Sequence, residues 1–140
     1  GGMQVGACLA GIAFLKGLGF VHAISHMVGA EYDTHHGLTN AVVLPAVLRF
    51  NAPAIADKVP AMMRALGQPG TDFDEFYRYV CALLDQFQIP RTLSELGVPE
   101  SAAETLTIKA LKDAAAGTNP RVSDADSLMS VITEAITVGR

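Results

Sequence analysis

The chain has 140 residues, 50% of them hydrophobic, with a formal net charge of −4 and a mean hydropathy of +0.31. This length suffices for one domain with its own hydrophobic core. The ten basic residues are scattered singly, which excludes the basic patch typical of proteins that bind nucleic acid or an anionic membrane. Cys8 and Cys81 are too few for a disulfide framework, so we expect a reducing, cytoplasmic compartment.

The chain begins with an apolar stretch, Met3–Leu15, that is shorter than the roughly 18–20 residues needed to span a bilayer. It also lacks the basic flank of a signal peptide. We expect a buried, central helix over Met3–Gly17, because its many small residues allow a neighbouring backbone to approach closely. A chain that starts inside an apolar helix is typical of a segment of a longer polypeptide. The alternative is a small protein with a buried N-terminal helix.

The rest of the chain also has the periodicity of helices, and no stretch alternates apolar and polar residues as a strand would. The predicted helical segments are Phe20–Val28, Gly37–Phe50, a short one from Asn51, Pro60–Leu66, Asp72–Gln86, Leu93–Leu96, Pro99–Ala115, and a last one that reaches Thr137. The fold class is therefore all-α, a bundle of about seven helices that forms a single domain over residues 1–140.

Several residues mark the expected helix ends. Gly29 is expected to end the second helix, and Pro45 to kink the third without abolishing it. Thr71 and Ser123 are the expected N-caps of the helices that follow them. The Met and Phe residues of the later helices are expected in the core.

All four histidines of the chain are clustered in one short stretch. His22 and His26 are four residues apart, so they share one face of the predicted helix. His36 follows a loop that can fold back toward that face. Imidazole is the commonest protein ligand for zinc, iron, copper and nickel, which makes these three side chains candidate metal ligands. The alternative is that they cap helices or satisfy buried carbonyls.

Two or three imidazoles do not complete a catalytic metal site, which usually needs three protein ligands and an open position. Glu31 and Asp33 in the intervening loop are further candidate ligands or supporting groups, and a solvated loop is the alternative. The His22/His26 pair lacks the Glu of the metalloprotease motif. The pair Gly17 and Gly19 lacks the third glycine and the preceding strand of a dinucleotide-binding motif.

Two runs, GLGFVHAISH from Gly17 and YDTHHGLTNAVVLPAVLRFN from Tyr32, resemble the iron-containing (group III) alcohol dehydrogenase family. The likeness extends through Gly97 to the late turn that ends at Arg121, and so covers essentially the whole chain. It implies the C-terminal helical domain of the dehydroquinate synthase-like/iron-containing alcohol dehydrogenase fold. In that family an N-terminal α/β domain, absent here, binds NAD or NADP and supplies an Asp and a His ligand.

The resemblance also implies roles for the histidines. Two metal-binding histidines of the family match His22 and His36. A third, close to the nicotinamide and proposed to relay protons, matches His26, which is therefore the catalytic and cofactor-contacting candidate. The family commonly has Pro where this chain has His35, so His35 competes with His36, and we prefer His36 because it precedes a family-like Gly37.

The expected function is that of the metal-binding C-terminal domain of an NAD(P)-dependent, iron-containing alcohol dehydrogenase, inactive without its other domain. The metal, Fe²⁺ with Zn²⁺ as the alternative, is expected to polarise the substrate oxygen while hydride passes between an alcohol/aldehyde pair and nicotinamide. The expected partners are this substrate, the N-terminal domain and a second copy in a homo-oligomer. The alternatives are a maleylacetate reductase or polyol dehydrogenase of the same superfamily, or a free-standing, non-catalytic helical interaction module.

Overall fold

The computed structural model describes residues 1–140 and contains seven α-helices, five short 3₁₀ helices and no strand. The α-helices are α1 (Gly2–Ala13), α2 (Phe20–Tyr32), α3 (His36–Ile55), α4 (Val59–Ala65), α5 (Phe73–Gln86), α6 (Ala103–Ala110) and α7 (Ala125–Thr137). The prediction of an all-α fold with about seven helices is confirmed.

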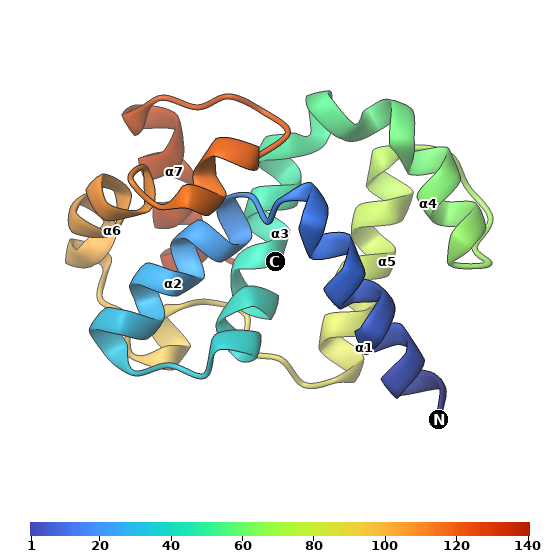
Figure 1. Cartoon of the computed structure of the whole chain (residues 1–140). Coiled ribbons are helices and arrows are strands. Elements are labelled where there is room, and N and C mark those ends of the chain that lie inside the picture. The colour runs from blue at the N-terminus through green and yellow to red at the C-terminus, as the bar shows by residue number, and fades with distance from the viewer.

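The main core lies where α2, α3, α6 and α7 pack against one another (Figure 1). A second, small core lies between α4 and α5, on the other side of α3 (Figure 1). Met63 and Phe76 belong to this small core, as expected for the later Met and Phe residues. Phe87 and Met129 do not follow that expectation, since they are 59% and 39% exposed.

Helix α1 is entirely exposed and has no buried residue. Its main contact within the chain is with the 3₁₀ turn that follows it, η1 (Phe14–Lys16). A methyl group added at Gly6 or Gly11 would meet no atom within 4 Å, so these small residues are not used for close packing here. The prediction of a buried, central first helix is therefore wrong, because no other element of the chain covers it.

The boundaries of α2 and α3 differ from the predicted ones. Helix α2 continues through Gly29 to Tyr32, and its C-cap residue Asp33 adopts the left-handed conformation (φ 51°) that terminates a helix. Helix α3 includes both Pro45 and Pro53, so the predicted separate segment from Asn51 is part of it. Buried side chains on both sides of each proline keep the helix packed through these positions.

Both predicted N-caps are displaced by one residue. Asp72 rather than Thr71 caps α5, in a capping box with Glu75, and Asp124 rather than Ser123 caps α7. Asp and Ser cap helices about equally well, so residue type alone does not rank Ser123 against Asp124, whereas the slightly better capping by Asp favours Asp72 over Thr71.

The helix predicted over Pro99–Ala115 is divided. A 3₁₀ turn, η4 (Glu100–Ala102), leads into α6, which ends at Ala110. Asp113 is extended (φ −71°, ψ 137°) and caps a further 3₁₀ turn, η5 (Ala114–Thr118). This break places the Asp113 carboxylate beside α2.

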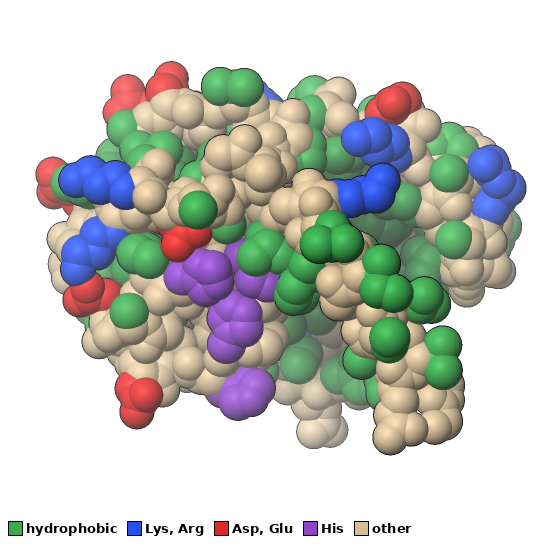
Figure 2. All heavy atoms as spheres, viewed as in Figure 1, with side chains coloured by type: hydrophobic (Ala, Val, Ile, Leu, Met, Phe, Trp, Pro, Cys, Tyr) green, Lys and Arg blue, Asp and Glu red, His purple; other side chains and the backbone are tan.

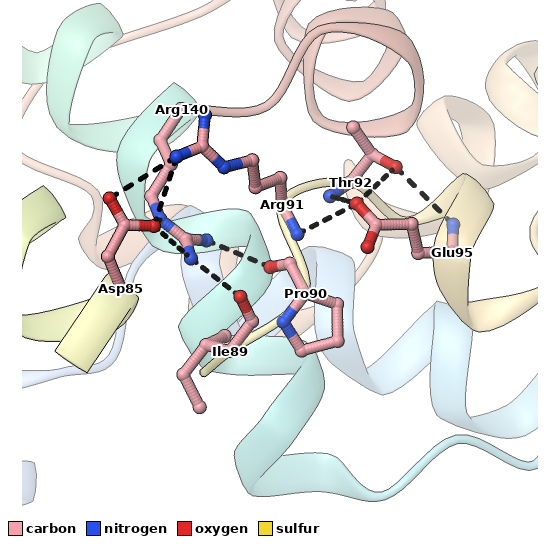
Figure 3. A network of polar contacts seen from close by, with 7 residues as sticks. All are labelled: Asp85, Ile89, Pro90, Arg91, Thr92, Glu95 and Arg140. Carbon is pink, nitrogen blue, oxygen red and sulfur yellow. Dashed lines mark hydrogen bonds and ion pairs between the residues drawn. The ribbon is translucent and has the colours of Figure 1, made fainter. Parts of the chain in front are cut away.

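Polar contacts anchor the last residue of the chain (Figure 3). The Arg140 side chain is 2% exposed and donates hydrogen bonds to the carbonyl oxygens of Ile89 (2.6 Å) and Pro90 (2.9 Å). The half-exposed Asp85 carboxylate accepts from both Arg140 and Arg91. Because a buried guanidinium needs partners, this network stabilises the packing of α7 against the segment after α5.

The helical stretch His36–Ala65 is long and apolar enough to cross a membrane by length and composition, and 44% of its apolar 18-residue window is buried inside the chain. A core helix passes the same test, and α3 is the helix on which α2 and α7 pack.

Candidate metal and proton-transfer site

Three of the four histidines form one cluster at the contact between α2 and α3. His22 and His26 lie on successive turns of α2, and His36 is the first residue of α3. The ring centroids are 5.2 Å apart for His22 and His36, 5.4 Å for His26 and His36, and 5.8 Å for His22 and His26. Figure 2 shows the histidine side chains gathered on one face of the molecule. The structure thus brings together the three residues that the sequence singled out.

Asn40, one turn into α3, lies between two of these rings. Its Nδ2 contacts the Nε2 atoms of both His22 (3.3 Å) and His36 (3.1 Å), while its Oδ1 is buried without a partner. An amide nitrogen donates and cannot accept, so with the Asn40 amide in this orientation both Nε2 atoms present a lone pair to the same point. A metal ion needs the same arrangement of its imidazole ligands.

The second ring nitrogen of His36, Nδ1, also has a neighbour within the chain. This atom lies 3.5 Å from the hydroxyl of Ser25, which is fully buried and donates to the carbonyl oxygen of His22. Burial lowers the pKa of His22, and the positive charges that His36 and His26 would carry lower it further. His22 is therefore neutral near pH 7, which is the form that binds a metal.

His26 has a partner from a distant part of the chain. Its Nδ1 lies 3.0 Å from Oδ2 of Asp113, and Oδ1 of Asp113 accepts from the N–H of Ala115 (2.8 Å). Partial burial by itself would raise the pKa of the Asp113 carboxyl, but the hydrogen bonds from Ala115 and His26 outweigh it and hold the pKa below its ordinary value. The pair joins α2 to the start of η5.

The remaining candidates lie outside the cluster. His35 is exposed and caps α3, its Nδ1 accepting from the N–H of Leu38 (3.3 Å). Glu31 forms an ion pair with Lys109 of α6, and Asp33 is the left-handed residue that ends α2. The geometry does not place Glu31 or Asp33 among the supporting groups of the histidine cluster.

The donor set fits a divalent metal in part. His22 and His36 offer two imidazole lone pairs to one point, and such donors suit iron and zinc. No group of three or more His, Cys, Asp or Glu side chains in the chain is arranged to hold a metal ion. Two imidazoles leave the coordination of such an ion incomplete, so tight binding would need further ligands besides these two.

The late turn of the chain holds the start of α2. The Thr118 hydroxyl accepts from the N–H of Leu18 (3.1 Å), and the Asn119 side chain accepts from that of Phe20 (3.1 Å). Gly17 has a positive φ (98°), and a methyl group there would overlap the Thr118 side chain. The turn thus fixes the first residues of the helix that carries His22 and His26.

Sequence reasoning missed the neighbours that orient the rings. Asn40 carries a local signal, because it lies four residues after His36 on one helix and so shares its face. Ser25 and Asp113 carry none. Asp113 reaches His26 only through the packing of α6 and η5 against α2.

Comparison with known proteins identifies relatives along the whole chain. The sequence profile described as "Fe-containing alcohol dehydrogenase family, C-terminal" matches residues 1–136. The chain is 34% identical over 136 residues to lactaldehyde reductase of Escherichia coli (strain K12), aligning 92% of this chain with 36% of that protein. It is 30% identical over 138 residues to the NADPH-dependent butanol dehydrogenase of Clostridium saccharobutylicum, again aligning 92% with 36%. The chain thus spans 36% of the length of these curated relatives.

Solved structures share the helical arrangement. A 1,3-propanediol oxidoreductase superposes with a TM-score of 0.80 at 32% identity, over 85% of this chain and 33% of that one. An alcohol dehydrogenase from Oenococcus oeni gives a TM-score of 0.78 at 27% identity, over 84% of this chain and 32% of that one. The fold of the chain therefore matches a helical part of each of these larger enzymes.

Proposed function

The chain belongs to the Fe-containing alcohol dehydrogenase family, and from this membership we propose that it is the metal-binding C-terminal domain of an NAD(P)-dependent alcohol dehydrogenase. The observation that carries the proposal is the convergence of the His22 and His36 Nε2 atoms on one point. The proposed metal is Fe²⁺, with Zn²⁺ as the alternative. The remaining ligands and the nicotinamide pocket would come from the part of the protein that precedes this domain.

Neighbouring groups of the chain set the charge or the orientation of each imidazole in the proposed ligand pair. A divalent metal bound there supplies polarisation of the oxygen of an alcohol or aldehyde. His22 contributes a neutral ring because burial lowers its pKa. His36 is held by Ser25 on one side and Asn40 on the other, so its Nε2 lone pair keeps its direction.

His26 is proposed to move the hydroxyl proton of the substrate, as a general acid–base group does. Its side chain is 37% exposed, so its ring is accessible from solvent. Phe20 and Ile24, on the same helix, are 3% and 0% exposed and belong to the main core.

The ligand pair is tested on the chain alone with Co²⁺, a spectroscopic substitute for Fe²⁺ and Zn²⁺. We expect weak binding of one ion per chain, which is lost in His22→Ala and in His36→Ala. His35→Ala is the matched control, because His35 is adjacent to His36 in sequence, but its ring caps α3 and lies outside the cluster. Unchanged Co²⁺ binding in His22→Ala or His36→Ala would overturn the assignment, as would its loss in His35→Ala.

The enzymatic part of the proposal is tested on the longer protein that contains this domain. We expect oxidation of small primary alcohols or diols with NAD or NADP, loss of activity after chelation, and restoration by Fe²⁺. The relatives named above include a lactaldehyde reductase, a butanol dehydrogenase and a 1,3-propanediol oxidoreductase, so the panel should contain lactaldehyde, butanol and 1,3-propanediol. Activity that persists without any metal would contradict the proposal.

A further inference from the structure

The two carboxylate oxygens of Asp113 contact two different groups. Oδ1 accepts from the N–H of Ala115 at 2.8 Å and closes the first turn of η5. Oδ2 faces Nδ1 of His26 at 3.0 Å. An ionised carboxylate can only accept hydrogen bonds, so the hydrogen between Oδ2 and the ring must belong to Nδ1.

This contact determines the chemical form of the ring. A neutral imidazole carries one proton, and a proton on Nδ1 leaves Nε2 as an acceptor. His26 stacks on His36 with an interplanar angle of 16°, which limits rotation of the ring away from Asp113. Asp113 itself is 15% exposed and is fixed by Ala115, so it cannot easily follow a displaced ring.

We propose that Asp113 is the positioning residue of the site: it holds the Nδ1–H tautomer of His26 and thereby leaves Nε2 as the atom that accepts the substrate's proton. The inference rests on the proposed proton-transfer role of His26. Asp113 touches neither substrate nor metal in this scheme and acts only through the ring.

The substitution Asp113→Asn reverses the polarity of the contact while it keeps the size of the side chain. The amide oxygen of the substituted side chain can still accept from the N–H of Ala115, which leaves the amide NH₂ facing Nδ1 of His26. Because an NH₂ group donates, Nδ1 must then carry the lone pair and the proton moves to Nε2. The variant thus presents a donor where the wild type presents an acceptor.

The tautomer is read directly by long-range ¹H–¹⁵N correlation of the ¹⁵N-labelled chain with EDTA present. The pH is set to about 8.5, roughly two units above the ordinary histidine pKa of about 6.5, so that the rings are neutral. The His26 signals are identified by their absence in His26→Gln. We expect Nδ1–H in the wild type and in Asp113→Glu, which keeps a carboxylate, and predominantly Nε2–H in Asp113→Asn.

Glu31→Gln is the matched control, because it removes a different carboxylate contact of α2, the ion pair of Glu31 with Lys109 of α6, without touching the histidines. It should leave the His26 tautomer unchanged. A wild-type His26 in the Nε2–H form would overturn the inference, even where Asp113→Asn fails to fold. So would an Nδ1–H ring in a folded Asp113→Asn. Since no metal or nicotinamide is present, this outcome is independent of the Co²⁺ and activity tests of the proposed function.

Discussion

The reciprocal amide pair between Asn51 and Asn119 offers a quantitative test of how the late turn holds α2. The Asn119 Nδ2 donates to Oδ1 of Asn51 (2.8 Å), and the Asn51 Nδ2 donates to Oδ1 of Asn119 (3.1 Å). Asn119 also accepts from the N–H of Phe20 and donates to the carbonyl of Arg121. One side chain therefore joins α3, the start of α2 and its own turn.

The substitution Asn119→Ala removes all four hydrogen bonds, but their costs are unequal. Asn51 is 6% exposed, and the N–H of Phe20 is partly buried, so neither regains full contact with water. A buried polar group left without a partner costs about 1–3 kcal/mol. Arg121 is exposed, and its carbonyl can bind water instead. We therefore expect a loss of about 3 kcal/mol in the free energy of unfolding, and a fall in Tm of roughly 10 °C for a domain of this size.

Urea denaturation followed by circular dichroism measures this loss. Ser130→Ala is the control, because its hydroxyl bonds only to an exposed backbone carbonyl on α7, and its effect should stay within about 0.5 kcal/mol. The double variant Asn51→Ala/Asn119→Ala should be more stable than the sum of the single effects predicts, by about 1 kcal/mol, because each single change leaves the other amide unpaired. Strict additivity, or a loss below about 0.5 kcal/mol for Asn119→Ala, would refute the argument.

Three further predictions concern other parts of the chain. Iodoacetamide should modify Cys8 well before Cys81, because Cys8 is exposed whereas burial raises the pKa of the Cys81 thiol. Peptide mass spectrometry measures both modification rates, and equal rates would contradict this prediction. Hydrogen bonds at the start of α7 lower the pKa of Asp124, so its stabilising effect is present above about pH 4 and lost as the pH falls further. The Tm advantage of the wild type over Asp124→Asn should therefore shrink in acid, and a constant difference would exclude this role. Ile132→Ala should cost about 2–5 kcal/mol because the side chain is fully buried, while Met129→Ala on the same helix, 39% exposed, should cost far less in the same urea experiment.

The sequence is sufficient to predict the number of helices, but not which helix faces are covered by other parts of the chain. Apolar periodicity reports that a side chain avoids water, and it gives α5 and α7 nearly in full. It does not report whether the covering partner lies in the same chain. Helix α1 shows this limit, because its small and apolar residues suggest a central position, yet every one of them is exposed.

The sequence predicts helix ends less well where the backbone conformation, rather than the residue type, determines where a helix stops. Gly29 is the obvious stop signal in α2, but the left-handed residue that ends the helix is Asp33. Asx side chains also tolerate this conformation, so a glycine four residues earlier is not decisive. The break after Ala110 was missed for a related reason, since Asp113 competes with the helix by capping η5.

Local spacing predicts the histidine cluster itself, but not the role and chemical form of each histidine within it. His35 and His36 are adjacent and identical in type, yet one caps α3 from the surface and the other stacks on His26. Successive residues at the start of a helix point about 100° apart, so only the placement of α3 against α2 decides which imidazole faces the other two histidines. The chemical form of each ring depends in turn on a partner. For His22 and His36 this is Asn40, whose spacing from His36 is a local signal. For His26 it is Asp113, 87 residues away, which no spacing reveals. For this reason the tautomer of His26 is a sharper test of the site than the presence of the histidines.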